Sequence, residues 1–237
     1  MLKLRCKEDT AIEVGIDEAG RGCLWGPLYA GAVIWPSLEE MSEDQIKVSE
    51  QIKDSKKLTP KRRTALAEKI KEIATSYGVG SVSAKEIDDF GITKSNQLAF
   101  TRALNNLDNQ PERLLIDGLL SIYDQPWSMI EQIVEPELDN TYISVAAASI
   151  LAKTEHDKWV TDFCEVNTNL AETYGFPNHK GYGTAKHRTA ILEHGTLEDH
   201  RALFLRKLFA GKKTVGAVNI APAVPPAHDT TAASAAS

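Results

Sequence analysis

Two adjacent acids and a glycine-flanked arginine follow an apolar stretch near the start of the chain. The segment GIDEAGRGCLWGP places Asp17 beside Glu18, and then Arg21 between Gly20 and Gly22. Neighbouring carboxylates repel each other, so both stay ionised only where a positive charge compensates them. The glycines let the backbone approach a ligand closely. The segment is therefore a candidate binding site, with an ordinary surface turn as the alternative.

Two further acids stand at the ends of predicted elements. Asp117 ends the short apolar stretch RLLID, and Asp139 lies at the front of an alanine-rich helical segment. All four acids could point into one cleft, where hard divalent cations such as Mg²⁺ or Mn²⁺ would supply the missing charge. Two such ions about 3.5–4 Å apart serve in-line attack on phosphate esters. Each acid alone could be a turn or helix-cap residue, so this hypothesis depends on the four together.

Three basic segments interrupt an acidic chain. The formal net charge of −6 argues against a polyanionic partner, but the distribution of charge matters more than its sum. Residues 53–63, 179–188 and 200–213 are rich in lysine and arginine, and the last two segments contain no acid. Solvated helix faces are the commoner origin of one charge run. Three runs beside an acidic cluster favour a nucleic-acid substrate.

Single residues in these segments have the chemistry to hold nucleic acid. Lys56 and Lys57 in DSKKLT, and Lys180 in HKGYGT, could contact phosphates, which position a substrate without reading its sequence. Tyr182 lies between two glycines and could stack on a base or a sugar. The alternative for KGYGT is a helix-entry loop capped by Thr184. The nearby histidines fit no common zinc spacing and have no cysteine pair, which disfavours a zinc site.

Length and composition are those of a globular chain. A chain of 237 residues and 26.0 kDa suits one large domain, or one domain with a small appendage. The sequence has no apolar run of bilayer-spanning length, and its N-terminus lacks the apolar core of a signal peptide. Three scattered cysteines disfavour a disulfide framework and fit a reducing compartment. We therefore expect a cytoplasmic protein with no membrane partner.

The hydrophobic pattern predicts the elements that must position these residues. Apolar runs bounded by turn residues predict strands over residues 12–17, 28–35, 78–84, 113–117 and 129–134. Capping residues and helical spacing predict helices over residues 60–78, 93–107, 138–167 and 184–194. This order predicts an α/β fold with a mixed sheet flanked by helices and a helical C-terminal lobe. From about residue 214 the chain is rich in Ala, Pro, Ser and Thr, which predicts a disordered tail.

Together the motifs resemble those of bacterial ribonuclease HII, a type 2 ribonuclease H, over about residues 11–209. They are GIDEAGRGCLWGP, DSKKLT, LLIDG, the helix containing SVAAASILAK, and NHKGYGTAKH with HGTLEDHR, in the order of the family. The related type III enzymes carry a separate N-terminal binding domain. Few residues precede the first predicted strand here, which favours type II. The resemblance implies a ribonuclease H-like catalytic domain over residues 1–210, with residues 211–237 as the tail.

The resemblance also implies roles for individual residues. Two divalent ions, Mg²⁺ or Mn²⁺, would be bound by four catalytic carboxylates: Asp17, Glu18, Asp117 and Asp139. The 2′-hydroxyl of a ribonucleotide would be sensed by Gly20, Arg21 and Gly22, while Tyr182 would pack against the sugar at the RNA–DNA junction. Phosphates would be contacted by Lys56, Lys57 and Lys180. Two positions depart from the family pattern: Gly91 replaces an expected asparagine, and His156 replaces an arginine.

The implied activity is hydrolysis of RNA in RNA–DNA hybrids and at ribonucleotides embedded in duplex DNA. Cleavage would fall on the 5′ side of the ribonucleotide and leave a 3′-hydroxyl and a 5′-phosphate. One metal would orient the attacking water and the other would stabilise the departing 3′-oxygen. We expect a monomer, and no motif in the sequence indicates a protein partner. The alternatives are a non-catalytic nucleic-acid binding module of the same fold, a divalent-metal phosphatase acting on small phosphate esters, and a structural protein.

Overall fold

A mixed sheet forms the centre of the computed structural model, which describes residues 2–52 and 58–210. Five strands lie in the order β3–β2–β1–β4–β5. β1 pairs antiparallel with β2, and β2 with β3, whereas β4 lies parallel to both β1 and β5. Their bounds are β1 (Glu13–Ala19), β2 (Leu28–Ile34), β3 (Ser76–Val82), β4 (Arg113–Asp117) and β5 (Glu131–Glu135). The predicted mixed sheet is confirmed.

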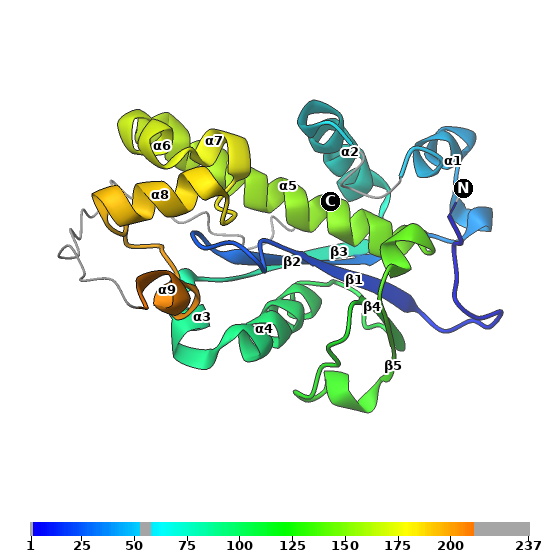
Figure 1. Cartoon of the computed structure of the whole chain (residues 1–237). Coiled ribbons are helices and arrows are strands. Elements are labelled where there is room, and N and C mark those ends of the chain that lie inside the picture. The colour runs from blue at the N-terminus through cyan, green and yellow to red at the C-terminus, as the bar shows by residue number, and fades with distance from the viewer. Residues whose placement is uncertain (1, 53–57, 211–237) are drawn as a thin grey trace.

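Helices cover both faces of the sheet, as Figure 1 shows. The long helix α5 crosses one face with α1 and α2 beside it, α3 and α4 cover the other face, and α6 to α9 form the predicted helical C-terminal lobe. Their bounds are α1 (Glu43–Ser49), α2 (Pro60–Ile73), α3 (Ala84–Phe90), α4 (Ile92–Asn105), α5 (Ile143–Val166), α6 (Thr168–Tyr174), α7 (Phe176–His179), α8 (Ala185–His194) and α9 (Ala202–Phe209). None of the helices in the described segments combines the length and apolar character needed to cross a membrane. The predicted tail, residues 211–237, lies outside the described residues.

The boundary between α2 and β3 differs from the prediction. The sequence pattern places the helix end at Gly78, whereas α2 ends at Ile73 and β3 begins at Ser76. The backbone N–H of Thr75 donates to the carbonyl of Ile34 at 3.0 Å, and the register pairs Ile34 with Ser76. Pairing with β2 therefore draws these residues into the sheet, a long-range contact that helix propensity cannot reveal.

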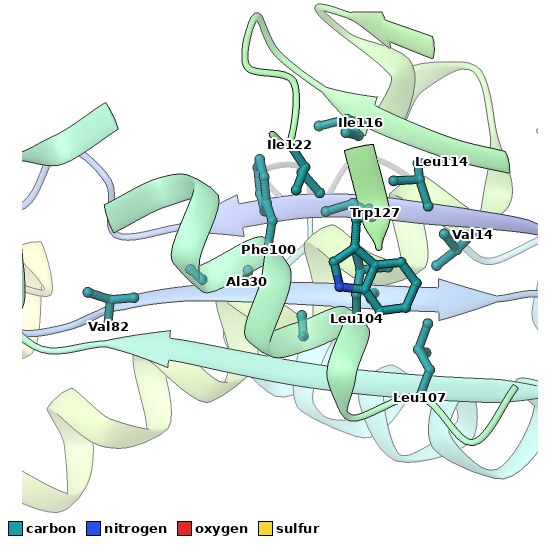
Figure 2. Close-up of a cluster of buried hydrophobic side chains, with 14 of the residues drawn as sticks. Val14, Ala30, Val82, Phe100, Leu104, Leu107, Leu114, Ile116, Ile122 and Trp127 are labelled. Carbon is teal, nitrogen blue, oxygen red and sulfur yellow. The ribbon is translucent and has the colours of Figure 1, made fainter. Parts of the chain in front are cut away.

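Two hydrophobic clusters fill the space between the sheet and its covering helices. On the α4 side, Phe100 and Leu104 pack with Val14 and Leu114 of the strands, and Trp127 closes the cluster (Figure 2). The opposite cluster joins α5 and α2 to the sheet. Residues 143–152 of α5 are buried without interruption, so most of the helix circumference in its first turns is covered by protein. This is the burial expected of a central helix rather than of a surface helix.

The helix α5 lies unusually close to the strands because two strand positions are glycine. A Cβ atom added to Gly15 of β1 would come within 2.2 Å of the carbonyl carbon of Ser144. One added to Gly31 of β2 would come within 2.4 Å of the carbonyl oxygen of Ala148. Contacts of this kind leave no room for a side chain. The alanines of α5 and these two glycines together set the distance between helix and sheet.

We predict that Gly15→Ala lowers the free energy of unfolding by about 2 kcal/mol or more, because the new methyl group overlaps the backbone of α5. Urea denaturation followed by circular dichroism measures the change. Ser81→Ala, an exposed position of β3, is the matched control and should change stability by less than about 0.5 kcal/mol. Equal stability of the Gly15→Ala variant and the parent would contradict the close packing of α5.

Candidate active site

Two of the predicted acids lie at the C-terminal ends of neighbouring parallel strands. β1 and β4 pair Ile16 with Ile116, and Asp17 and Asp117 are the next residue of each strand. Side chains at matching positions of paired strands project from the same face of the sheet. The strand pairing therefore brings together two carboxylates that are far apart in the sequence.

Asp17 is a buried carboxylate among like charges. It is only 7% exposed, and its Oδ1 accepts a hydrogen bond from the backbone N–H of Glu18 at 2.7 Å. Burial raises the pKa of Asp17 well above its usual value, the charges of Glu18 and Asp117 raise it further, and a hydrogen bond from Ser149 opposes them. A cation beside this group would restore the ionised form. The chemistry of the position thus fits a divalent metal.

Asp139 reaches the same end of the sheet through a short turn. Residues 138–140 form a 3₁₀ turn, and Asp139 is only 2% exposed. The Oδ1 atom of Asp117 accepts a hydrogen bond from the backbone N–H of Leu138 at 2.8 Å. One predicted metal ligand therefore holds the turn that carries another.

The predicted place of Asp139 at the front of the long helix needs correction, because α5 begins only at Ile143. The backbone of Lys3 pairs with this segment: its N–H donates to Thr141, and its carbonyl accepts from Ile143. The N-terminal residues thus use backbone groups that an earlier start of the helix would need. Asp139 is placed by the turn rather than by helical spacing.

Glu18 follows Asp17 in β1, and consecutive strand residues face opposite sides of a sheet. Its Oε1 lies 4.0 Å from a guanidinium nitrogen of Arg21. Within residues 2–52 and 58–210, no three Asp, Glu, His or Cys side chains are close enough together to hold a metal ion as placed. The four acids lie near one end of the sheet, and their side chains would have to rotate to close on a cation.

The glycine-arginine-glycine loop and Tyr182 are neighbours, although the sequence separates them widely. Cys23 and Tyr182 form an antiparallel bridge, and the N–H of Leu24 donates to the carbonyl of Gly181 at 2.9 Å. A Cβ atom at Gly22 would lie 3.9 Å from a ring carbon of Tyr182. The tyrosine is 38% exposed, so part of its ring remains available to a ligand.

His156 fills the space beneath this loop, at the position where the family resemblance predicts arginine. It is fully buried, and a Cβ at Gly20, whose φ is +81°, would come within 2.5 Å of its ring. Burial lowers the pKa of His156. Asp157 beside it is paired with Arg63 at 2.7 Å and with Lys153 at 2.8 Å. Two other cations thus supply positive charge next to Asp157.

The predicted phosphate-contacting lysines are only partly described. Lys56 and Lys57 lie outside the described residues. Lys180 is half-buried and has a left-handed backbone with a φ of 49°, directly before the loop that carries Tyr182. The sequence pattern does not single out Lys153, yet its Nζ lies 5.4 Å from the centre of the Tyr182 ring. Positive charge therefore lies beside the exposed tyrosine.

Comparison with known proteins decides the family. A sequence model of the family described as Ribonuclease HII matches residues 14–212. The chain belongs to the ribonuclease HII family. As a member, it is a metal-dependent endoribonuclease that acts on RNA in RNA–DNA hybrids, which confirms the activity and the fold that the motifs predicted.

Relatives and solved structures agree with this assignment. The chain is similar to ribonuclease HII of Prochlorococcus marinus, with 42% identity over 194 residues, covering 82% of this chain and 96% of that one. The ribonuclease HII of Bacteroides thetaiotaomicron is 43% identical over 196 residues, covering 81% and 89%. The crystal structure of ribonuclease H2 from Pyrococcus horikoshii superposes with a TM-score of 0.63 at 28% identity, covering 83% of this chain and 96% of that one.

Arg201, to which the sequence pattern assigns no role, contacts the loop of residues 20–27 between β1 and β2, called the signature loop below. This residue is fully buried. Its Nε donates to the carbonyl of Gly26 at 2.9 Å, and one terminal nitrogen donates to the carbonyl of Arg21 at 3.0 Å. The segment HGTLEDHR resembles a family motif, but only the fold shows that its arginine contacts the loop.

Two buried histidines and one partly buried histidine lie close together behind Tyr182. His187 and His200 lie with their Nε2 atoms 3.0 Å apart, and the ring of His179 stacks on His187 at 4.6 Å. Burial lowers the pKa of His187 to about 4 and that of His200 to about 3. Neighbouring imidazoles act in the same direction, His179 on His187 and His187 on His200. Both residues are therefore neutral at neutral pH.

We predict that these two histidines make the folded state acid-sensitive below the usual histidine pKa of 6.5. In this pH range the two histidines bind protons in the unfolded chain but not in the folded chain. The free energy of unfolding therefore falls as pH drops from about 6.5 to about 4. Two protons correspond to a slope of up to about 2.7 kcal/mol per pH unit. Urea denaturation between pH 7 and pH 5 measures this slope.

His200→Gln should reduce that slope by about one proton, because one of the two buried imidazoles is removed. An unchanged slope in the His200→Gln variant would show that the pair does not cause the acid sensitivity.

Proposed function

We propose that this ribonuclease HII cuts on the 5′ side of ribonucleotides, in RNA–DNA hybrids and in duplex DNA, with Asp17, Glu18, Asp117 and Asp139 as its metal ligands. The products would be a 3′-hydroxyl and a 5′-phosphate. The observation that carries the proposal is the buried Asp17 beside Asp117, a pair of like charges that favours a bound cation. The proposed catalytic domain is residues 1–210, acting as a cytoplasmic monomer.

The acids would hold Mg²⁺ or Mn²⁺, two ions during catalysis. When bound, such ions activate a water and neutralise charge developing on the reacting phosphate. Oxygen ligands of this kind suit both metals. Asp117 also accepts from the N–H of Leu138, which supports the turn carrying Asp139. This hydrogen bond would keep Asp117 and Asp139 at a fixed distance from each other during catalysis.

Recognition of the ribonucleotide would fall to the loop next to the acids. Gly20, Arg21 and Gly22 would bring backbone groups to the 2′-hydroxyl, which is the group that distinguishes RNA from DNA. Tyr182 would pack on the sugar at the junction, because its exposed ring borders Gly22. Lys180, together with Lys56 and Lys57 in the other basic segment, would contact phosphates.

We predict that Asp17→Asn lowers cleavage of a duplex containing one ribonucleotide by about 10³-fold or more. The substitution removes a metal ligand, and several kcal/mol of transition-state stabilisation correspond to this factor. Gel assays with Mg²⁺ or Mn²⁺ measure the rate, and calorimetry measures metal binding. The variant should fold at least as stably without metal, since it removes a buried, repelled charge.

The matched control is Asp44→Asn, since Asp44 lies exposed on α1 and should not affect cleavage. Full activity of the Asp17→Asn variant, or no cleavage by the parent protein with either metal, would contradict the proposed mechanism. Substrate binding without metal-dependent turnover would instead indicate a binding module. Hydrolysis of a small phosphate ester would indicate a phosphatase.

A further inference from the structure

A chain of hydrogen bonds runs from the C-terminal lobe to the backbone of Tyr182. The N–H of Leu197 donates to Nδ1 of His200 at 2.7 Å, and Nε2 of His200 lies 3.0 Å from Nε2 of His187. The Nδ1 of His187 lies 3.0 Å from the carbonyl oxygen of Tyr182. His187 is fully buried and His200 is 6% exposed, so water does not substitute for these contacts.

The two groups at the ends of this series of hydrogen bonds, the N–H of Leu197 and the carbonyl of Tyr182, determine the tautomer of each histidine. A backbone N–H can only donate, so Nδ1 of His200 carries no proton. A carbonyl can only accept, so Nδ1 of His187 carries one. The shared contact is then satisfied in one way for two neutral rings: Nε2–H of His200 donates to the bare Nε2 of His187. A second proton on either ring would set two N–H groups against each other.

These hydrogen bonds also connect two loops that lie on either side of the signature loop. Leu24 donates its N–H to Gly181 on one side, and its carbonyl accepts from the N–H of Arg201 on the other, each at 2.9 Å. The histidine pair joins those same two loops behind this segment, through residues 182 and 200. The carbonyl of Tyr182 receives a second hydrogen bond from the N–H of Thr184 at 2.9 Å, so its peptide group is held from two directions.

We propose that His187 and His200 are positioning residues that fix Tyr182 against the glycine-arginine-glycine loop, so that its ring is preorganised for the ribonucleotide. The inference rests on the proposed role of Tyr182 in substrate recognition. The ring of Tyr174 packs beside His200 and that of Phe176 beside His187. Such aromatic surroundings would accept an apolar side chain in place of either histidine. Two buried imidazoles cost desolvation there unless every polar atom is bonded, and the chain to Tyr182 supplies those bonds.

Two near-isosteric variants separate positioning from packing. The side-chain amide of Asn can place a donor where Nδ1 of His187 lies, whereas that of Gln reaches the place of Nε2. His187→Asn therefore keeps the bond to Tyr182 and loses the partner of His200. His187→Gln does the reverse. His187→Asn leaves the buried Nε2–H of His200 without an acceptor, whereas His187→Gln leaves the carbonyl of Tyr182 its bond from Thr184. A purely structural role therefore predicts that His187→Asn is the more disruptive variant, the opposite of what a positioning role predicts.

The measurement is the dissociation constant of a fluorescent duplex containing one ribonucleotide, followed by anisotropy in the Asp17→Asn background so that the duplex is not cut. We expect His187→Gln to weaken binding about tenfold, the factor expected for one lost hydrogen bond. His187→Asn should weaken it by less than about threefold. An all-DNA duplex should show little difference between the variants. His194→Gln serves as the control on an exposed histidine of the same helix.

A double-mutant cycle tests whether the effect passes through Tyr182. In a Tyr182→Ala background, His187→Gln should cause no further loss of binding. Nitrogen-15 NMR of the parent protein at pH 7 should show His200 with its proton on Nε2 and His187 with its proton on Nδ1.

Equal binding by His187→Asn and His187→Gln, additive losses in the cycle, or the opposite tautomer of His187 would each overturn the proposal. None of these readouts requires cleavage, so a parent enzyme that fails to cut would count against the proposed function alone.

Discussion

The close packing of α5 against β1 and β2 determines where the rest of the site lies. Gly15 and Gly31 allow helix and strand backbones to touch, and no side chain could separate them without moving the helix. At this distance Ser149 reaches Asp17, and Lys153 one turn later reaches the loop of the proposed substrate site. The helix therefore contacts both a predicted metal ligand and a predicted recognition residue.

The two ends of the central strands differ in how their acids are compensated. At the starts of β4 and β1, Arg113 pairs with Glu13 at 2.6 Å, and it also reaches Glu131 of β5 at 2.8 Å. At the other end, Asp17 and Asp117 accept hydrogen bonds from neutral backbone N–H groups. Like charges remain close together there, which costs stability in the absence of a cation. Such a local cost is typical of functional sites.

The C-terminal lobe packs against the signature loop and donates hydrogen bonds to its backbone. Its core is aromatic, with Trp25 of the loop segment stacked on Phe176 at 3.8 Å. Arg201 adds hydrogen bonds to loop carbonyls, and the bonds of His187 and His200 reach the backbone of Tyr182. The loop is thus held in place by contacts from a part of the chain more than a hundred residues away. The glycines of the loop only leave space for these contacts.

The sequence by itself determined the features that depend on neighbouring residues. Thr59 followed by Pro60 marks the start of α2, and the apolar run RLLID marks β4 with Asp117 at its end. The motif order also determined the family, because each motif keeps its residues together in the chain. The positions of Asp17, Glu18 and the glycines were readable in the same way.

Only the tertiary structure decided the features that depend on distant partners. The end of α2 depends on pairing of β3 with β2, and the position of Asp139 depends on the backbone of Lys3 and the side chain of Asp117. No local pattern in the sequence could have linked His200 to Tyr182. Local propensity is set by residues a few positions apart, whereas these contacts exist only once the sheet has brought remote segments together.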